Sequence, residues 1–403
     1  MQAGIRRPVA RVVVLLMAVS CVFFGFQTLA RAESGTDGYF AWTDDEMPEG
    51  CAAVTGYTGA GGIVEIPETL NGKTVAVIGS DAFAGQTAIT QISMPDTVTS
   101  IEYGAFMGCT SLSDVTFSSN LATIAGDAFM NCSSLNHVTI PDSVLNIDFA
   151  TFKNCTSLTD ITLSNNLESL GQNVFEGCTA LETLALPDSL AEQEDNIGPN
   201  TFLDCTSLEN VTFPDGIAAI PETMFRGCTS LTNMNVPDSV VTIGEGAFEG
   251  SGLLSVTLPT GITSIGASAF KDCTALPSVT VPDTVSELAY GTFIGCTSLT
   301  DVTLPHGLGI INGENFKNCT SLSEITIPDT VTRIDSGTFF GCTSLSDITL
   351  SATLESIGQS TFENCAALSE IIIPGRVTYI GVEAFKDCST LDKVTVAEPY
   401  GGF

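Results

Sequence analysis

Hydrophobic residues recur along the chain with a period of 23 residues, and the most regular of them is a phenylalanine. Eleven of the thirteen gaps between successive copies are 23 residues, and the other two are 27 and 22. The copies are Phe83, Phe106, Phe129, Phe152, Phe175, Phe202, Phe225, Phe248, Phe270, Phe293, Phe316, Phe339, Phe362 and Phe385. A compact globular domain does not need such spacing, whereas a stack of similar units does.

Each unit reads close to C-T-S-L-x-x-I-T-I-P-D-T-V-x-x-I-G-x-x-A-F-x-x. In one such unit, the apolar and β-branched residues of 322–327 stop at Pro328, which predicts a short strand with one buried face. The apolar pair Val331 and Ile334 predicts a second, shorter extended segment on the opposite wall. Residues 337–339 then turn the chain back and place the phenylalanine in the core.

One unit alone cannot enclose its apolar residues, but stacked units bury them in columns of leucine, valine or isoleucine, and phenylalanine. We therefore expect an α/β-type or mostly-β repeat solenoid of about fourteen units, on the order of 65 Å long at the spacing of neighbouring strands. The predicted divisions are a signal peptide at 1–32, a small N-terminal β cap at 33–66, the solenoid at 67–396 and a tail at 397–403. The aromatic residues Tyr39, Phe40, Trp42 and Tyr57 are expected to pack in the core of the cap, with exposed contacts as the alternative.

Three irregularities interrupt the repeat. Residues 71–73 read as a hairpin turn, and residues 192–195 form a four-residue acidic insertion that should bulge from the stack. One residue is missing near 251–252. Insertions in solenoids map to surface loops, often near a binding face.

The first 32 residues predict export. Arg6, Arg7 and Arg11 precede an apolar run at 12–29, and residues 30–32 (Ala-Arg-Ala) offer a cleavage site between small residues, so the mature chain should begin near Glu33. An uncleaved membrane anchor is the alternative, because the apolar run is long for a signal. Lipid attachment at Cys21 is disfavoured, because residues 18–20 lack the usual leucine. The protein is thus expected to be secreted or on the cell surface, with no membrane span after cleavage.

The expected mature chain is strongly acidic. The whole sequence carries 13 basic and 46 acidic residues, for a net charge of −33. Four of the basic residues and none of the acids lie in the first 32 residues, which leaves a mature net charge of −37. Such a surface repels nucleic acid and anionic lipid and favours cations or basic partners. Solubility alone is the other explanation of the charge.

Twelve of the fourteen cysteines follow the repeat phenylalanine by three residues. They are Cys109, Cys132, Cys155, Cys178, Cys205, Cys228, Cys273, Cys296, Cys319, Cys342, Cys365 and Cys388. Because their spacing is that of the repeat, we interpret them as buried free thiols that act as small core residues. Bridges between adjacent units are the alternative. A metal site is disfavoured, since only His137 and His306 could join them.

Two columns of side chains should face outward from the main strands. One is almost entirely threonine, and the other contains Asp114, His137 and Asp160 and, further on, Asp301, Glu324, Asp347 and Glu370. Carboxylates stacked at strand spacing repel each other unless a cation or a basic partner lies over them. Asp301, Glu324, Asp347 and Glu370 are therefore our candidate site, a strip that binds cations or amines; a solvated face is the alternative.

A third acidic column follows the strand proline and is interpreted as turn capping. It consists of Asp96, Asp142, Asp188, Asp215, Asp238, Asp283 and Asp329.

Motifs for catalysis are missing from the sequence. It has no Gly-x-Ser-x-Gly, no His-Glu-x-x-His, no phosphate-binding glycine-rich loop and no EF-hand loop. We therefore expect no catalytic residue, no cofactor and no metal, and we do not expect an enzyme.

The units resemble the BspA-like, or treponemal, type of leucine-rich repeat. The similarity rests on L-x-x-I-x-I-P, V-x-x-I-G and A-F-x-x-C in residues 322–342, and residues 53–59, 66–67 and 71–75 resemble the usual beginning of such repeats. It covers residues from about 51 to 396. The resemblance implies a leucine-rich-repeat protein that adheres to host matrix proteins such as fibronectin and fibrinogen, to other microbes or to immune receptors. No family residues for binding or catalysis carry over, and the chain lacks the Leu-Pro-x-Thr-Gly sorting motif of many members.

Two functions stay open at this point. The first is an adhesin whose strand face binds host extracellular matrix or microbial surface proteins, basic proteins among them. The second is a structural spacer in a larger surface assembly, without a saturable ligand of its own. The short sequence after the last strand, residues 391–396, suggests either a truncated gene or an interface at that end.

Overall fold

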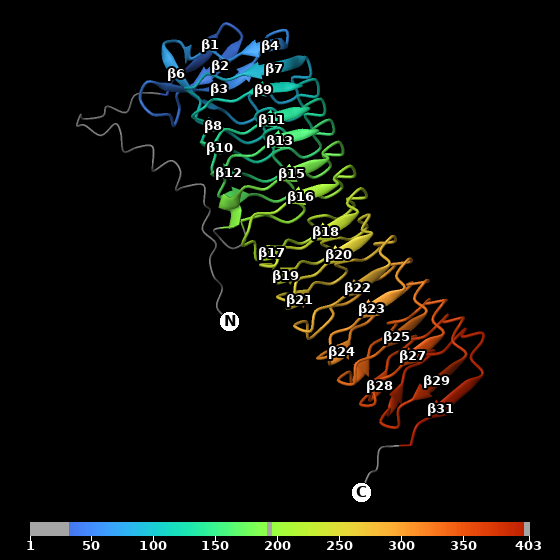
Figure 1. Cartoon of the computed structure of the whole chain (residues 1–403). Coiled ribbons are helices and arrows are strands. Elements are labelled where there is room, and N and C mark those ends of the chain that lie inside the picture. The colour runs from blue at the N-terminus through green and yellow to red at the C-terminus, as the bar shows by residue number, and fades with distance from the viewer. Residues whose placement is uncertain (1–31, 192–195, 399–403) are drawn as a thin grey trace.

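The computed structural model describes residues 32–191 and 196–398, which form one elongated stack of units that follow each other in chain order (Figure 1). The predicted bulge at 192–195, the leader at 1–31 and the last residues of the tail lie outside this part. The fold is the predicted mostly-β solenoid, with about 15 turns of about 23 residues. In the described part of the chain, the helical element is one short 3-10 turn, η3 (Asp188–Ala191), just before the insertion.

One strand of each unit lies on a common face that we call the front wall. Its strands are β4 (Gly62–Glu65), β7 (Ile89–Ser93), β9 (Asp114–Thr116), β11 (His137–Thr139), β13 (Asp160–Thr162), β15 (Thr183–Ala185), β16 (Asn210–Thr212), β18 (Asn233–Asn235), β20 (Ser255–Thr257), β22 (Ser278–Thr280), β23 (Asp301–Thr303), β25 (Glu324–Thr326), β27 (Asp347–Thr349), β29 (Glu370–Ile373) and β31 (Lys393–Val396). The hydrogen-bonded pairs are parallel and join neighbouring units, mostly two strands at a time, as in β22–β23, β25–β27 and β29–β31. Within β25–β27, Glu324 lies opposite Asp347. The strand predicted within residues 322–327 is confirmed as β25.

The second extended segment of each unit forms the opposite face, the back wall. Its strands are β3 (Cys51–Tyr57), β6 (Lys73–Ile78), β8 (Ser100–Ile101), β10 (Thr123–Ile124), β12 (Asn146–Ile147), β14 (Ser169–Leu170), β17 (Ala219–Ile220), β19 (Thr242–Ile243), β21 (Ser264–Ile265), β24 (Ile310–Ile311), β26 (Arg333–Ile334), β28 (Ser356–Ile357) and β30 (Tyr379–Ile380). Two units contribute single bridges instead, at Ile197 and Leu288. The prediction of a second extended segment from Val331 and Ile334 is confirmed as β26.

Antiparallel strands cover the first unit. β1 (Ser34–Asp37) pairs with β2 (Phe40–Thr43), which pairs with β3, and the short β5 (Thr69–Leu70) folds back on β6 through the predicted hairpin turn. Trp42 is buried, and the rings of Phe40 and Tyr57 pack against Phe83. The prediction that the cap aromatic residues pack in the core is wrong for Tyr39, whose side chain is 63% exposed. Strands β3 and β4 lie within the predicted cap, yet they already pair in parallel with strands of the solenoid. The pairing therefore marks no boundary at residue 66, and that boundary stays a prediction.

The phenylalanines form the predicted column through the centre of the stack. Adjacent rings from Phe83 to Phe385 lie 5.0–5.9 Å apart between centroids, with interplanar angles of 4–16°. Twelve of them, from Phe83 to Phe339, are among the largest fully buried side chains. Because each ring stacks on the ring of the next unit, the hydrophobic core is continuous from Phe83 to Phe385.

The repeat cysteines lie beside this column as free thiols, and no described cysteine is in a disulfide. Each Sγ donates to the carbonyl oxygen of the phenylalanine one unit earlier, as in Cys178 to Phe152 at 3.1 Å. The residue before each cysteine is glycine, asparagine or aspartate because its backbone is left-handed, with φ of 60° at Asn318 and 74° at Gly341. The interpretation as buried free thiols is confirmed.

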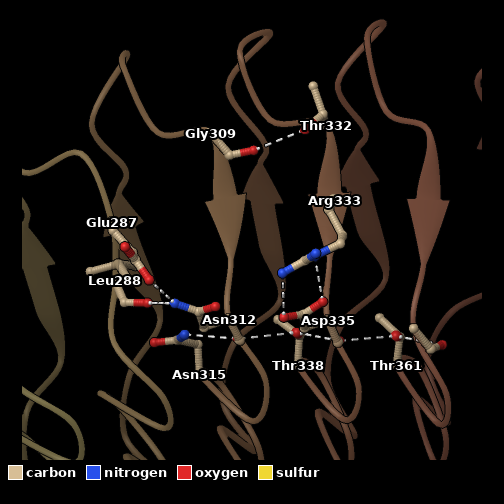
Figure 2. Close-up of polar contacts among 11 residues, drawn as sticks. Glu287, Leu288, Gly309, Asn312, Asn315, Thr332, Arg333, Asp335, Thr338 and Thr361 are labelled. Carbon is tan, nitrogen blue, oxygen red and sulfur yellow. Dashed lines mark hydrogen bonds and ion pairs between the residues drawn. The ribbon is translucent and has the colours of Figure 1, made fainter.

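Buried hydroxyl and amide groups tie the units together along one edge of the back wall (Figure 2). The Thr338 hydroxyl donates to the carbonyl of Asp335 at 2.7 Å and lies 3.5 Å from that of Asn312. The Thr361 hydroxyl makes the equivalent pair of contacts one unit further on. These side chains satisfy carbonyl groups that the short back-wall strands leave free.

Candidate binding surface

The four carboxylates of the candidate strip occupy the first position of consecutive front-wall strands. Asp301 begins β23, Glu324 begins β25, Asp347 begins β27 and Glu370 begins β29, and all four are exposed. Because side chains alternate along a strand, the next residue of each strand points into the core and the carboxylate points outward. The structure therefore brings the four predicted residues into one column, with Glu324 and Asp347 directly opposite each other.

The last carboxylate of the strip already has a partner. Lys393 of β31 lies opposite Glu370, with its Nζ 2.7 Å from the carboxylate, and its ammonium group lowers the pKa of Glu370. Asp301, Glu324 and Asp347 have no ion pair with another described residue. The strip therefore consists of three open carboxylates followed by a neutralised one.

Two shallow hollows follow the strip along the front wall. The first is lined by Asp301, Glu324 and Asp347 with the neighbouring threonines, and His306 and Pro328 bound it on the side of the turns. The second is lined by Asp347, Glu370 and Arg376 together with apolar residues such as Ile372. The carboxylates thus form the floor of a depression that an extended ligand could occupy.

The predicted threonine column lies beside the strip, and all its members are exposed. They are Thr116, Thr139, Thr162, Thr212, Thr257, Thr280, Thr303, Thr326, Thr349 and Thr395. In β23, β25 and β27 each carboxylate is therefore followed two residues later by a hydroxyl on the same face. In each of these units, a ligand over the surface therefore meets a carboxylate, which accepts hydrogen bonds, and a threonine hydroxyl, which both donates and accepts them.

The spacing of the carboxylates determines which cation fits. Each unit supplies one carboxylate, and the described residues contain no group of three or more His, Cys, Asp or Glu placed to hold a metal ion. Calcium requires six to eight oxygen ligands around one point. A ligand whose positive charges are themselves spread out, such as a basic polypeptide, matches the column better than a single ion.

The first part of the same column is different. Asp114 is followed by His137, whose Nδ1 lies 3.0 Å from Asp160, and the next five strands begin with neutral residues. Among the described front-wall strands, the run of open carboxylates at this position in consecutive units is that of β23, β25 and β27.

The third acidic column has the predicted capping role at three positions. Asp96, Asp142 and Asp283 each accept a hydrogen bond from a backbone N–H of the following unit, those of Ser119, Asn165 and His306. These hydrogen bonds lower the pKa of Asp96 and Asp283. The carboxylates therefore stabilise the contact between units.

Most basic residues are already paired with a carboxylate of the molecule. Nine lysines and arginines follow residue 32, and eight of them form ion pairs within the molecule. Most of these pairs join neighbouring units. The acidic excess of the chain consequently faces solvent.

Exposed aromatic residues on the back wall were missed by the sequence reasoning. The rings of Tyr103 and Phe149 lie 6.2 Å apart, two units from each other, and a side chain on Gly126 of the unit between them would collide with the Phe149 ring. Tyr290 lies beside Gly313 in a similar way. The detectable signal was an aromatic residue three positions before the repeat phenylalanine, with glycine at that position in the next or preceding unit.

Within the described residues, no helix has both the length and the apolar character that crossing a bilayer requires.

Comparisons with known proteins agree with this architecture. The sequence matches the family described as BspA type leucine-rich repeat region over residues 76–197, 195–320 and 309–400. A leucine-rich repeat protein from Bacteroides ovatus is 26% identical, with a TM-score of 0.73 over 93% of this chain and 90% of that one. The pneumococcal vaccine antigen PcpA is 19% identical, with a TM-score of 0.56 over 91% and 99% of the two chains. No curated protein matches the sequence significantly.

Proposed function

Because this chain belongs to the family of BspA-type leucine-rich-repeat proteins, we propose that it is an exported binding protein, not an enzyme, whose front wall holds a basic segment of another protein. The partners would be host extracellular matrix or microbial surface proteins, and the protein would act in adhesion at the cell surface or after secretion. The observation that carries the proposal is the column of open carboxylates on β23, β25 and β27, which lies in a shallow depression.

The physical basis is a sum of weak interactions. An exposed ion pair contributes roughly 0.2–1 kcal/mol, so binding requires several of them at once. The rigid walls fix the carboxylates in advance, which reduces the entropy lost on binding. Attraction between exposed charges is screened by salt, so affinity should fall as ionic strength rises.

Binding of purified residues 33–403 to fibronectin, fibrinogen and poly-L-lysine tests the proposal. The variant D301N/E324Q/D347N/E370Q should weaken binding roughly tenfold, since three open carboxylates can no longer pair with the ligand and Lys393 is released from Glu370. A matched control, D148N/E168Q/E287Q/E355Q, removes the same number of charges beside the back wall, and its affinity should change less than about twofold. Equal losses in the two variants would show an effect of net charge alone and contradict a defined strip.

The length of the rod favours a second candidate, a spacer that holds other surface components at a distance. The stack extends without interruption from the cap to β31 (Figure 1). A spacer predicts no saturable binding to any of the three probes. Saturable binding that the front-wall variant abolishes would show that the protein is not a spacer alone.

A further inference from the structure

The residue at the expected start of the mature chain is held by its main chain. The backbone nitrogen of Glu33 donates to Oδ1 of Asp44, and the backbone nitrogen of Asp44 donates to the Glu33 carbonyl at 2.9 Å. Glu33 directly precedes β1, and Asp44 directly follows β2. The first residue of the cap is thus fixed to the far end of the antiparallel pair.

A lysine from the solenoid completes this cluster. Lys73, the first residue of β6, pairs with Oδ2 of Asp44, and its Nζ lies 3.2 Å from the Glu33 carboxylate and 5.5 Å above the Trp42 ring. The side chains of Asp44 and Lys73 are only 19% and 22% exposed. Two carboxylates, of which that of Glu33 is 63% exposed, therefore share one cation, which leaves one negative charge uncompensated.

The position of the missing positive charge coincides with the predicted cleavage site. We propose that a signal peptidase hydrolyses the bond between Ala32 and Glu33, and that the new α-ammonium group of Glu33 forms an ion pair with Asp44 that locks the cap onto the solenoid. In the hydrolysis, the hydroxyl of water adds to the Ala32 carbonyl carbon and its proton goes to the Glu33 nitrogen. At neutral pH that nitrogen binds a further proton, and the cluster then holds two carboxylates and two cations.

The geometry requires no rearrangement for this change. The Glu33 nitrogen already lies at hydrogen-bond distance from Oδ1, while the Lys73 ammonium occupies Oδ2. Hydrogen bonds within the cluster lower the pKa of Asp44, through Lys73 first and Glu33 second, and raise the pKa of Lys73. Both groups therefore stay charged over the range in which an α-amino group, with a pKa of about 8, gains its proton.

The pH dependence follows from the sign of this interaction. A carboxylate partner raises the pKa of the folded ammonium above that of the unfolded chain. The stabilisation is complete below about pH 7.7 and disappears as the pH rises through the folded value. The charged groups that face the amine are Asp44, Lys73 and the Glu33 side chain. The pKa of Asp44 is lowered and that of Lys73 is raised, so both lie further from the range in which the amine titrates.

The single tryptophan of the chain, Trp42, lies in the cap and reports its opening by fluorescence. The first measurement is the mass of the protein exported from its own precursor, which should correspond to residues 33–403. The second compares urea-induced opening of the cap in this chain and in the same chain acetylated at Glu33, which keeps the N–H donor but not the charge. At about pH 6 the acetylated cap should be open roughly fivefold more often, and the difference should vanish near pH 10.

The variant Asp44→Asn supplies the internal control, because acetylation should have no further effect on it. A mature chain that begins elsewhere would overturn the cleavage site. Identical opening of the free and acetylated caps at about pH 6 would overturn the ion pair. Both outcomes are independent of the front-wall strip, so this inference and the proposed function can fail separately.

Discussion

Asn315 is a side chain whose hydrogen bonds are only partly satisfied. Its amide nitrogen donates to the carbonyls of Ala289 and Asn312, at 3.0 and 2.8 Å, but its buried Oδ1 has no partner among the described residues (Figure 2). The neighbouring units carry Thr292 and Thr338 at this position, and each donates a hydroxyl to a carbonyl three residues earlier. A buried acceptor without a partner costs about 1–3 kcal/mol.

We therefore expect Asn315→Thr to stabilise the protein by about 1 kcal/mol, because the hydroxyl replaces the bonded nitrogen and removes the unpaired oxygen. The measurement is the midpoint of thermal unfolding by circular dichroism. Thr338→Val is the opposite control, since it deletes the hydroxyl from a satisfied position and should lower the midpoint. A lower midpoint for Asn315→Thr would mean that the amide is needed for a contact between units.

At the scale of elements, glycine at the end of a back-wall strand sets how closely two units approach. A Cβ on Gly358, directly after β28, would lie 2.4 Å from the backbone nitrogen of Ser336 in the previous unit. Backbone atoms cannot move aside as a side chain can. Gly309, just before β24, has no heavy atom within 4 Å of an added Cβ and does not have a left-handed backbone.

These two glycines give a matched prediction. Gly358→Ala should destabilise the protein by about 2 kcal/mol, because the units must separate locally, whereas Gly309→Ala should be neutral or stabilise it slightly through the unfolded chain. Urea unfolding of both variants provides the comparison. Equal midpoints would show that the units can separate at Gly358 without loss of packing.

The sequence predicted the elements well because each repeat position has one structural task. Pro328 ended a strand, the pair Val331 and Ile334 marked the back wall, and the 23-residue period required the phenylalanine column. The column of Asp301, Glu324, Asp347 and Glu370 could also be predicted from the 23-residue period. Residues one period apart take the same position on successive front-wall strands and therefore lie in one column. Lys393, 23 residues after Glu370, occupies the same position and could have been recognised as its partner.

Other features depend on contacts that no single unit contains. The exposed pair Tyr103 and Phe149 requires Gly126 in the unit between them, so the pattern appears only when three units are compared. The contact between Glu33 and Asp44 depends on how the antiparallel strands of the cap close, for which the repeat offers no template. The hollows depend on how far the turns project beyond the strands.

At the scale of the whole molecule, the column of twelve thiols couples stability to pH. Burial raises the pKa of Cys109 to about 11 and that of Cys178 to about 12, whereas an unfolded cysteine ionises near 8.5. Burial also raises the pKa of thiols in the middle of the column, such as Cys155. The folded chain thus retains protons that the unfolded chain releases.

Stability should therefore be unaffected by the thiols below about pH 8 and fall as the pH rises towards 11, by up to about 1.4 kcal/mol per pH unit for each thiol. Urea unfolding under reducing conditions at several alkaline pH values measures the slope. The variant Cys296→Ala/Cys319→Ala should show a shallower decline. If the free energy of unfolding falls with pH equally steeply in this variant and in the parent chain, groups other than these thiols cause the loss of stability at alkaline pH.

The phenylalanine column also makes the length of the molecule adjustable in whole steps. Each ring presents nearly the same face to the ring before it and the ring after it, with small interplanar angles throughout. If a gene lost the segment between two equivalent points, for example after Cys319 and after Cys342, one whole unit would be removed. The units on either side would then pack against each other nearly as each had packed against the lost unit. Recombination within such a gene would then shorten or lengthen the row of carboxylates one charge at a time, and so adapt it to partners of different size without redesigning the interior.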